Sequence, residues 1–169
     1  SAKSLAVDSS GVYVTGGFSG TVNFNSSGSA NLSSPDVNTV NGYLVKLDGN
    51  GAYQWAHKVG DLGSGVALDT SASYVHITGH FSGTNDFNPG VGTSNSSSLG
   101  STDAYLLTLN IDGTFVRVAR FGNFYTDQGR NITVDSTGNV LATGIFTTSA
   151  NGPVDFDPGA GTANLIAQS

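Results

Sequence analysis

The residues best suited to chemistry in this chain are paired aspartates and asparagines on either side of a phenylalanine. The pattern reads Asp-Phe-Asp-Pro-Gly from Asp155 and Asp-Phe-Asn-Pro-Gly from Asp86. In an extended segment, residues two apart point the same way, so Asp155 and Asp157 would present their oxygens together, as would Asp86 and Asn88. Joined by turn carbonyls and water, such a pair suits Ca²⁺, which binds six to eight oxygens.

A second interpretation of the same motif needs no metal. An Asp or Asn before Pro-Gly forms an Asx-turn, in which the side chain accepts a hydrogen bond from the backbone two residues on. A third copy, Asn-Phe-Asn from Asn23, carries no carboxylate and would bind a cation most weakly. The motif favours the turn over calcium, and both interpretations stay open at the level of sequence.

Other aspartates recur at equivalent places in the chain. Asp8, Asp69 and Asp135 lie between two short apolar runs, which is typical of hairpin turns rather than of a metal site. Asp61 and Asp127 each precede such a run, where we expect them to accept backbone N–H bonds and to tie successive units together. Both interpretations are structural.

No constellation of residues indicates an enzyme. His57, His76 and His80 have no partners at the spacing that a catalytic or zinc site needs, and the chain contains no nucleophile elbow, P-loop or zinc-protease motif. Glycines that follow threonine, at Gly16, Gly79 and Gly144, indicate close backbone packing rather than phosphate binding. We therefore expect a protein that is not an enzyme.

The elements that must position these residues repeat along the chain. The anchors Asp8, Asp69 and Asp135 are 61 and 66 residues apart, and Phe18, Phe81 and Phe146 keep nearly the same step. Such a period indicates a repeat architecture. We expect units at 1–60, 61–122 and 123–169, the last being half a unit that comprises two strands and a loop.

Each complete unit predicts four strands in meander order and an irregular excursion between the second and third. The 24 glycines and the absence of helical apolar spacing favour an all-β chain. A four-stranded antiparallel sheet repeated about every 62 residues is typical of a β-propeller blade, whereas the coils of a parallel β-helix are much shorter. The expected strands are 4–7, 12–16, 43–47 and 53–56, then 66–68, 74–78, 105–109 and 115–118, then 132–134 and 140–143.

The repeated sequence segments also resemble those of a known family. The segments V-D-S-S-G-V-Y-V-T-G-G-F, D-A-Y-L-L-T-L-N-I-D-G and D-F-D-P-G-A-G-T-A-N-L resemble the bacterial β-propeller repeat often called the SBBP repeat. The resemblance covers essentially the whole chain, although the first unit has Asn-Phe-Asn-Ser-Ser-Gly where the family has Asp-Phe-Asp-Pro-Gly. It implies a propeller-like fold and a secreted or cell-surface location in bacteria, and it transfers no catalytic residue.

Charge and composition limit the classes of partner that the chain is expected to bind. A net charge of −6 argues against nucleic acid, no apolar run is long enough to span a membrane, and no cysteine is present. Tyr53, Trp55, Phe124 and Tyr125 could stack on sugars, although aromatic residues at strand ends more often pack between sheets.

Together these features predict a structural or adhesive module, with a glycan- or protein-binding module as the alternative. Two and a half blades cannot close a ring, so we expect a homo-oligomer, a filament, or the remainder of a longer polypeptide.

Overall fold

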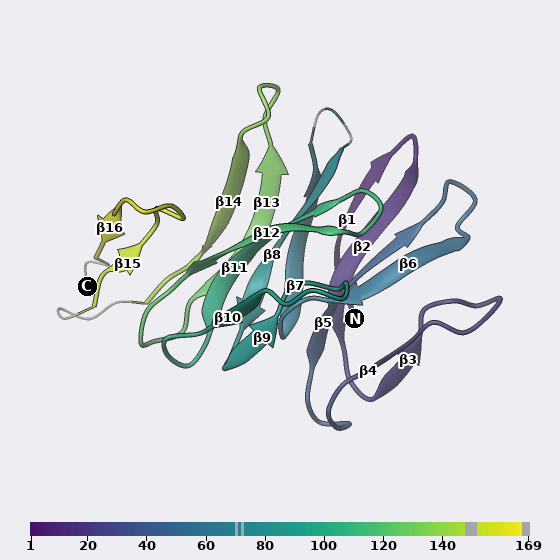
Figure 1. The fold of residues 1–169 in the computed structure, drawn as a ribbon, viewed down its shortest axis with the longest axis horizontal. Coiled ribbons are helices and arrows are strands. Elements are labelled where there is room, and N and C mark those ends of the chain that lie inside the picture. The colour runs from purple at the N-terminus through teal and green to yellow at the C-terminus, as the bar shows by residue number, and fades with distance from the viewer. Residues whose placement is uncertain (70, 72, 148–151, 167–169) are drawn as a thin grey trace.

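The chain folds into antiparallel β-sheets. The computed structural model describes residues 1–69, 71, 73–147 and 152–166, and these residues contain strands, turns and loops but no helix (Figure 1). In this part of the chain no helix is therefore long and apolar enough to cross a membrane. The prediction of an all-β fold is confirmed.

The first sheet has four strands that neighbour one another in the order β1-β2-β5-β6. A short hairpin of two further strands, β3 and β4, leaves the sheet between β2 and β5. Tight turns join the strands, and Gly11 at the first turn has a φ of 143° that favours glycine. The strands are β1 (Ala2–Asp8), β2 (Gly11–Phe18), β3 (Thr21–Asn23), β4 (Asn31–Ser33), β5 (Asn41–Leu47) and β6 (Tyr53–Lys58).

The second sheet repeats this topology, and the third begins it. The second has the neighbour order β12-β11-β8-β7 with a separate hairpin β9-β10, while the third pairs β13 with β14 and is followed by the hairpin β15-β16. The strands are β7 (Leu62–Leu68), β8 (Tyr74–Phe81), β9 (Thr84–Asp86), β10 (Asn95–Ser97), β11 (Asp103–Asn110), β12 (Phe115–Phe121), β13 (Gln128–Val134), β14 (Val140–Ile145), β15 (Val154–Asp155) and β16 (Asn164–Leu165).

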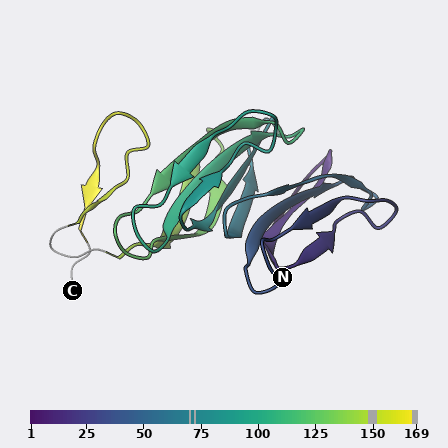
Figure 2. The same cartoon turned by 60° about the horizontal axis from the view of Figure 1, so that its bottom comes forward.

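The sheets pack face to face in the order of the chain, and both ribbon views show them as successive layers (Figures 1 and 2). The first strands lie nearest one another, with β7 between β1 and β13. The largest apolar core fills the space between the first two sheets: Tyr13 and Leu44 of the first sheet meet Ile77, Leu107 and others of the second, all essentially inaccessible to solvent. Burial of this apolar area is the main stabilising contribution.

The opposite face of the first sheet is covered only in part. The hairpin β3-β4 folds over it, and Phe24 and Leu32 pack beside Phe18 in a second, smaller core. Toward β1 the cover ends, and Leu5 and Val7 are 63% and 62% exposed. β1 is thus covered on one face, where Ala6 packs against the main core, and open to solvent on the face that carries Leu5 and Val7.

The ten strands expected in the three main sheets are all present, but several of them are longer than the sequence predicted. β2 and β8 continue through Gly16-Gly17 and Gly79 to Phe18 and Phe81, and β7 starts at Leu62 rather than Val66. The excursions, which were expected to be irregular, each hold a two-stranded hairpin. Among the described residues the sheets form neither a closed barrel nor a complete propeller.

Candidate functional site

The motif Asp-Phe-Asn-Pro-Gly and its two sister copies lie in the excursions that follow the second strand of each unit, and we call them the excursion motif. Each copy forms two consecutive Asx-turns. In the second unit, Asp86 Oδ1 accepts hydrogen bonds from Asn88 N at 3.0 Å and Ser94 N at 2.8 Å. Asn88 Oδ1 then accepts one from Gly90 N at 2.9 Å. The first side chain therefore closes the hairpin from inside, and the second caps the tight turn that follows it.

The same pattern occurs in the other two units. Asp155 Oδ1 accepts from Asp157 N at 3.0 Å and from Ala163 N at 2.8 Å. In the first unit the neutral Asn23 accepts the equivalent bonds from Asn25 N and Ala30 N, at 3.0 and 2.9 Å. The turn interpretation thus accounts for the recurrence of these residues, and a carboxylate is not needed for it.

Backbone donors also set the acidity of these aspartates. The hydrogen bond from Ser94 N, followed by that from Asn88 N, lowers the pKa of Asp86 below its ordinary value. The bonds from Ala163 N and Asp157 N do the same to the pKa of Asp155. Both side chains are therefore ionised at neutral pH, as an aspartate must be to bind calcium.

The phenylalanine inside each motif points the other way, into the protein. Phe87 lies 5.2 Å from Phe81 and 5.0 Å from Tyr105, measured between ring centroids, and it is 1% exposed. In the first unit Phe24 lies 5.9 Å from Phe18 and 4.8 Å from Tyr43. In the first two units the motif therefore anchors its hairpin on an aromatic trio drawn from the second strand, the excursion and the third strand.

The third unit has only two members of this trio. Phe156 lies 5.1 Å from Phe146, and no described residue of the third unit stands where Tyr43 and Tyr105 stand in theirs. Phe121, from the end of β12, also stacks on Phe156, with a centroid distance of 6.1 Å.

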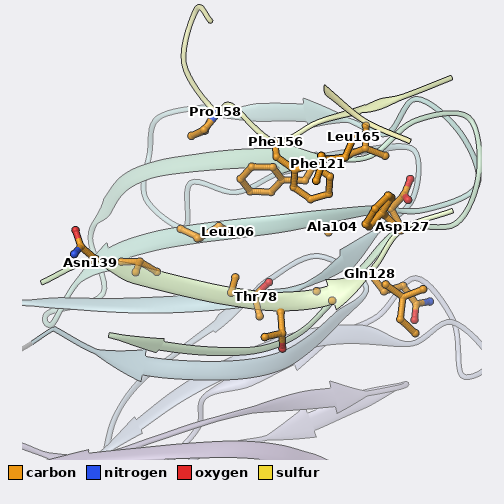
Figure 3. A pocket seen from close by; sticks show the side chains of 18 of the residues that line it. Thr78, Ala104, Leu106, Phe121, Asp127, Gln128, Asn139, Phe156, Pro158 and Leu165 are labelled. Atoms are coloured by element: carbon orange, nitrogen blue, oxygen red, sulfur yellow. The ribbon is translucent and has the colours of Figure 1, made fainter. Parts of the chain in front are cut away.

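A cavity of about 650 Å³ opens at this place, between the second and third sheets. Its walls include Thr78, Ala104 and Leu106 of the second sheet, the length of β14, and the hairpin β15-β16. Figure 3 shows Phe121 and Phe156 side by side above the strand that carries Leu106. The wall is mainly apolar, and polar groups stand at its ends, among them Asn139, Gln128 and Asp127.

The other predicted aspartates have structural roles. Asp8 Oδ1 accepts from Ser10 N, and Asp69 Oδ1 and Asp135 Oδ1 accept backbone N–H bonds in the same way, so the hairpin prediction is confirmed. Asp61 Oδ2 accepts from Ser82 N, and Asp127 Oδ1 from Thr147 N, at 2.9 and 2.8 Å. These last two aspartates accept backbone N–H bonds as expected, but the donors lie in their own units: each aspartate holds the end of the second strand, and Asp127 also accepts from Asn123 N. The prediction that these bonds tie successive units together is therefore wrong.

The histidines do not share a site. His76 is buried in β8, where its Nδ1 lies 3.1 Å from Thr108 Oγ1, and His57 stacks on Trp55 at 4.9 Å. Among the described residues, no three His, Asp, Glu or Cys side chains are grouped so as to hold a metal. Calcium at Asp86 and Asn88, or at Asp155 and Asp157, stays a prediction.

The aromatic residues that were candidates for sugar binding separate into two groups. Trp55 and Tyr53 pack against the cores, and Trp55 Nε1 donates to Ile111 O at 3.3 Å between the first and second sheets. Phe124 and Tyr125 lie in the connection between β12 and β13 and are 70% and 43% exposed. Only the second pair offers aromatic faces to a ligand.

One ion pair was missed from the sequence. Arg120 Nη1 lies 2.6 Å from Oδ2 of Asp103, which is fully buried at the start of β11. Burial raises the pKa of Asp103, and the bond from Arg120 opposes that effect. The sequence contained one signal that this position is structural: Asp103 and Asn41 both lie two residues before the tyrosine of the third strand.

In comparisons with family models and with curated proteins, nothing matches this chain.

Proposed function

We propose that this chain is a non-catalytic structural or adhesive module with propeller-like blades, of the kind found in secreted or surface proteins of bacteria. The observation that carries the proposal is the repeated four-stranded meander whose first strands lie together, with β7 between β1 and β13. Blades of a propeller are arranged in this way around an axis. The resemblance of the repeated segments to the SBBP repeat supports the same conclusion.

The loops of this module have few charged side chains to hold them together. Charged residues make up 11% of the chain. The large polar loops are built from Ser, Asn, Thr and Gly, whose side chains satisfy one another and the backbone through Asx-turns rather than through ion pairs.

Surface labelling tests the location, and coated beads test adhesion. An antibody raised against the chain should label intact cells of a bacterium that produces it, and added protease should remove the label. Beads that carry the chain should adhere to cells or to extracellular matrix more than uncoated beads. Label that appears only after the cells are lysed would contradict the proposal.

Calcium would act in this proposal as a stabiliser of the excursion hairpins. An ion that binds only the folded state raises stability by mass action. Millimolar calcium should therefore raise the melting temperature, and the double change Asp155→Asn and Asp157→Asn should remove part of that rise. Identical melting curves with calcium and with chelator would exclude the ion and leave the turns alone.

A glycan- or protein-binding role is the second candidate, and the exposed pair Phe124 and Tyr125 favours it. Both rings lie in one loop and are accessible to a ligand. Saturable binding on a glycan array that is lost in Tyr125→Ala would support this role. Trp55→Ala is a poorer test, because Trp55 holds two sheets together and its loss would disturb the fold.

A further inference from the structure

The third strand of each complete unit enters its sheet in the same register. Tyr43 of β5 pairs with Gly16 of β2, and Tyr105 of β11 pairs with Gly79 of β8. The threonine before each glycine fixes this register, because Thr15 Oγ1 donates to Tyr43 O at 2.6 Å and Thr78 Oγ1 to Tyr105 O at 2.8 Å. A glycine is required opposite the tyrosine, since an added Cβ at Gly79 would overlap the carbonyl of Leu62.

The tyrosine then fills a socket made by the preceding connection. Tyr105 is completely buried, and its hydroxyl donates to Val59 O and Leu62 O, both at 3.2 Å. Leu107 and Leu109 follow on the same face and are buried in the core between the first two sheets. That core covers Leu44 of the first sheet completely.

The third unit contains the same socket in a form that is open. Thr143 and Gly144 of β14 correspond to Thr78 and Gly79, and an added Cβ at Gly144 would overlap the carbonyl of Gln128 as that at Gly79 overlaps Leu62. Among the described strands, β14 pairs only with β13. The carbonyls that correspond to Val59 and Leu62 belong to Phe121 and Gln128, which both line the cavity of about 650 Å³.

A matched pair of leucines shows what covers this site in the sister unit. Leu44 and Leu106 occupy the same position of the third strand, one residue after the tyrosine. Leu44 is fully buried in the core that it shares with Leu107 and Leu109 of β11, whereas Leu106 is only half-buried and faces the cavity. The cavity therefore lies where the third strand lies in the complete units, and its mainly apolar wall suits such a strand.

We propose that β14 and this cavity form an acceptor for one extended peptide strand. The strand would pair antiparallel with β14 and carry a tyrosine opposite Gly144, with aliphatic residues two and four positions later, as in Tyr-x-Leu-x-Leu. Backbone hydrogen bonds along β14 would supply affinity and the side-chain sockets specificity, as in other cases of β-strand addition. The tyrosine hydroxyl would donate to the carbonyls of Phe121 and Gln128, and Thr143 to the carbonyl of the tyrosine itself.

The proposal does not depend on where the protein resides or on what its loops bind. It rests on the cavity and on the two occupied sockets of the same chain. Its occupant is a peptide of stated pattern, and a second copy of the chain is the competing occupant that the experiment must separate.

The test uses the intact chain and a synthetic peptide with the sequence of residues 102–110, flanked by lysines for solubility. This sequence occupies the corresponding place in the second unit. We expect saturable binding with one peptide per chain and slower amide exchange over Val140–Ile145 of β14. A peptide with alanine in place of the tyrosine should bind at least about tenfold more weakly, because a buried aromatic anchor dominates such contacts.

Variants of the chain localise the binding. Leu106→Gln puts a polar group in the cavity wall and should weaken binding several-fold, while Val91→Gln, at a fully exposed loop position, should not. Melting curves establish that both variants are folded. The proposal is overturned if the peptide does not bind, if the alanine peptide binds equally well, or if β14 exchange is unchanged. It is also overturned if β14 becomes protected as the chain alone is concentrated, since a second copy would then be the occupant.

Discussion

At the scale of single residues, the excursion motif separates the role of an oxygen from the role of a charge. Asn23 and Asp86 accept the same two backbone hydrogen bonds in sister hairpins. What the hairpin requires is an acceptor on a short side chain, and the net charge of that side chain is free to serve another purpose, such as the binding of a cation.

This separation gives a prediction for Asp86. Asp86→Asn should leave the melting temperature in chelator nearly unchanged, because the amide oxygen replaces the carboxylate oxygen. Asp86→Ala should lower it by a few degrees, because Asn88 N and Ser94 N lose their acceptor. Thermal unfolding followed by circular dichroism measures both, and Thr93→Ala, at an exposed position in the loop of the same hairpin, is a control. Equal losses for the asparagine and alanine variants would show that the charge itself holds the hairpin.

The buried histidines predict a dependence of stability on pH. Burial lowers the pKa of His57, His76 and His80 in the folded protein. As the pH falls below about 6.5, the unfolded chain therefore binds protons before the folded chain does, and the free energy of unfolding falls. We expect a lower melting temperature at pH 5 than at pH 7, and a smaller difference in His76→Gln. Equal melting temperatures at the two pH values would contradict this prediction.

At the scale of elements, glycines decide how closely the sheets approach. An added Cβ at Gly63 of β7 would overlap Thr15 Oγ1 of the first sheet, which already donates to Tyr43 O. Gly129 of β13 faces Thr78 Oγ1 of the second sheet in the same way. The contact between successive sheets is thus built twice from one glycine and one threonine.

We therefore expect Gly63→Ala to destabilise the chain by about 1–3 kcal/mol, the usual cost of overpacking. Gly49→Ala is the matched control, since nothing lies within 4 Å of a Cβ added there. Chemical denaturation measures both changes. Addition of Thr15→Ala to Gly63→Ala should recover part of the loss, and strictly additive losses would show that the two side chains do not meet.

Two other glycines, Gly16 and Gly79, explain why the sequence predicted the order of the strands better than their ends. The turns at Asp8, Asp69 and Asp135 and the apolar runs beside them are local signals, and the structure has a hairpin at each. Gly16 and Gly79 resembled strand ends because glycine weakens an isolated strand. In the protein the strands continue through them, and the carbonyl of Ser1 or of Leu62, beside the neighbouring strand of the same sheet, occupies the space that a side chain would need.

The candidate site was predictable only in part for a related reason. The pairing of Asp and Asn two residues apart is local, so the Asx-turns could be expected from the motif. The aromatic trios join residues up to 25 positions apart in the first unit, and the cavity depends on which trio lacks a member. The recurrence of Tyr43 and Tyr105 in the sequence indicated that a tyrosine belongs at this position. The cavity itself could not be predicted, because it depends on how far apart the second and third sheets lie.

At the scale of the whole molecule, the first sheet leaves one apolar face of the stack open to solvent. The face of the first sheet that carries Leu5 and Val7 corresponds to the face of the second sheet that the first sheet covers. Repeat proteins normally place polar residues on such terminal faces. Here the face keeps the apolar character of an internal one, and an exposed apolar face of this kind favours association.

We predict that the isolated chain associates through this face at micromolar concentrations or above. Two copies can pack these faces together about a two-fold axis, which requires no strand from the partner and leaves β14 free. In sedimentation experiments the average mass should rise with concentration. The double change Leu5→Lys and Val7→Lys should suppress the rise, because it places charges on the apolar face, whereas Val91→Lys on an exposed loop should not. A folded chain that stays monomeric at every concentration would show that the hairpin β3-β4 already covers enough of the face to make it stable in water.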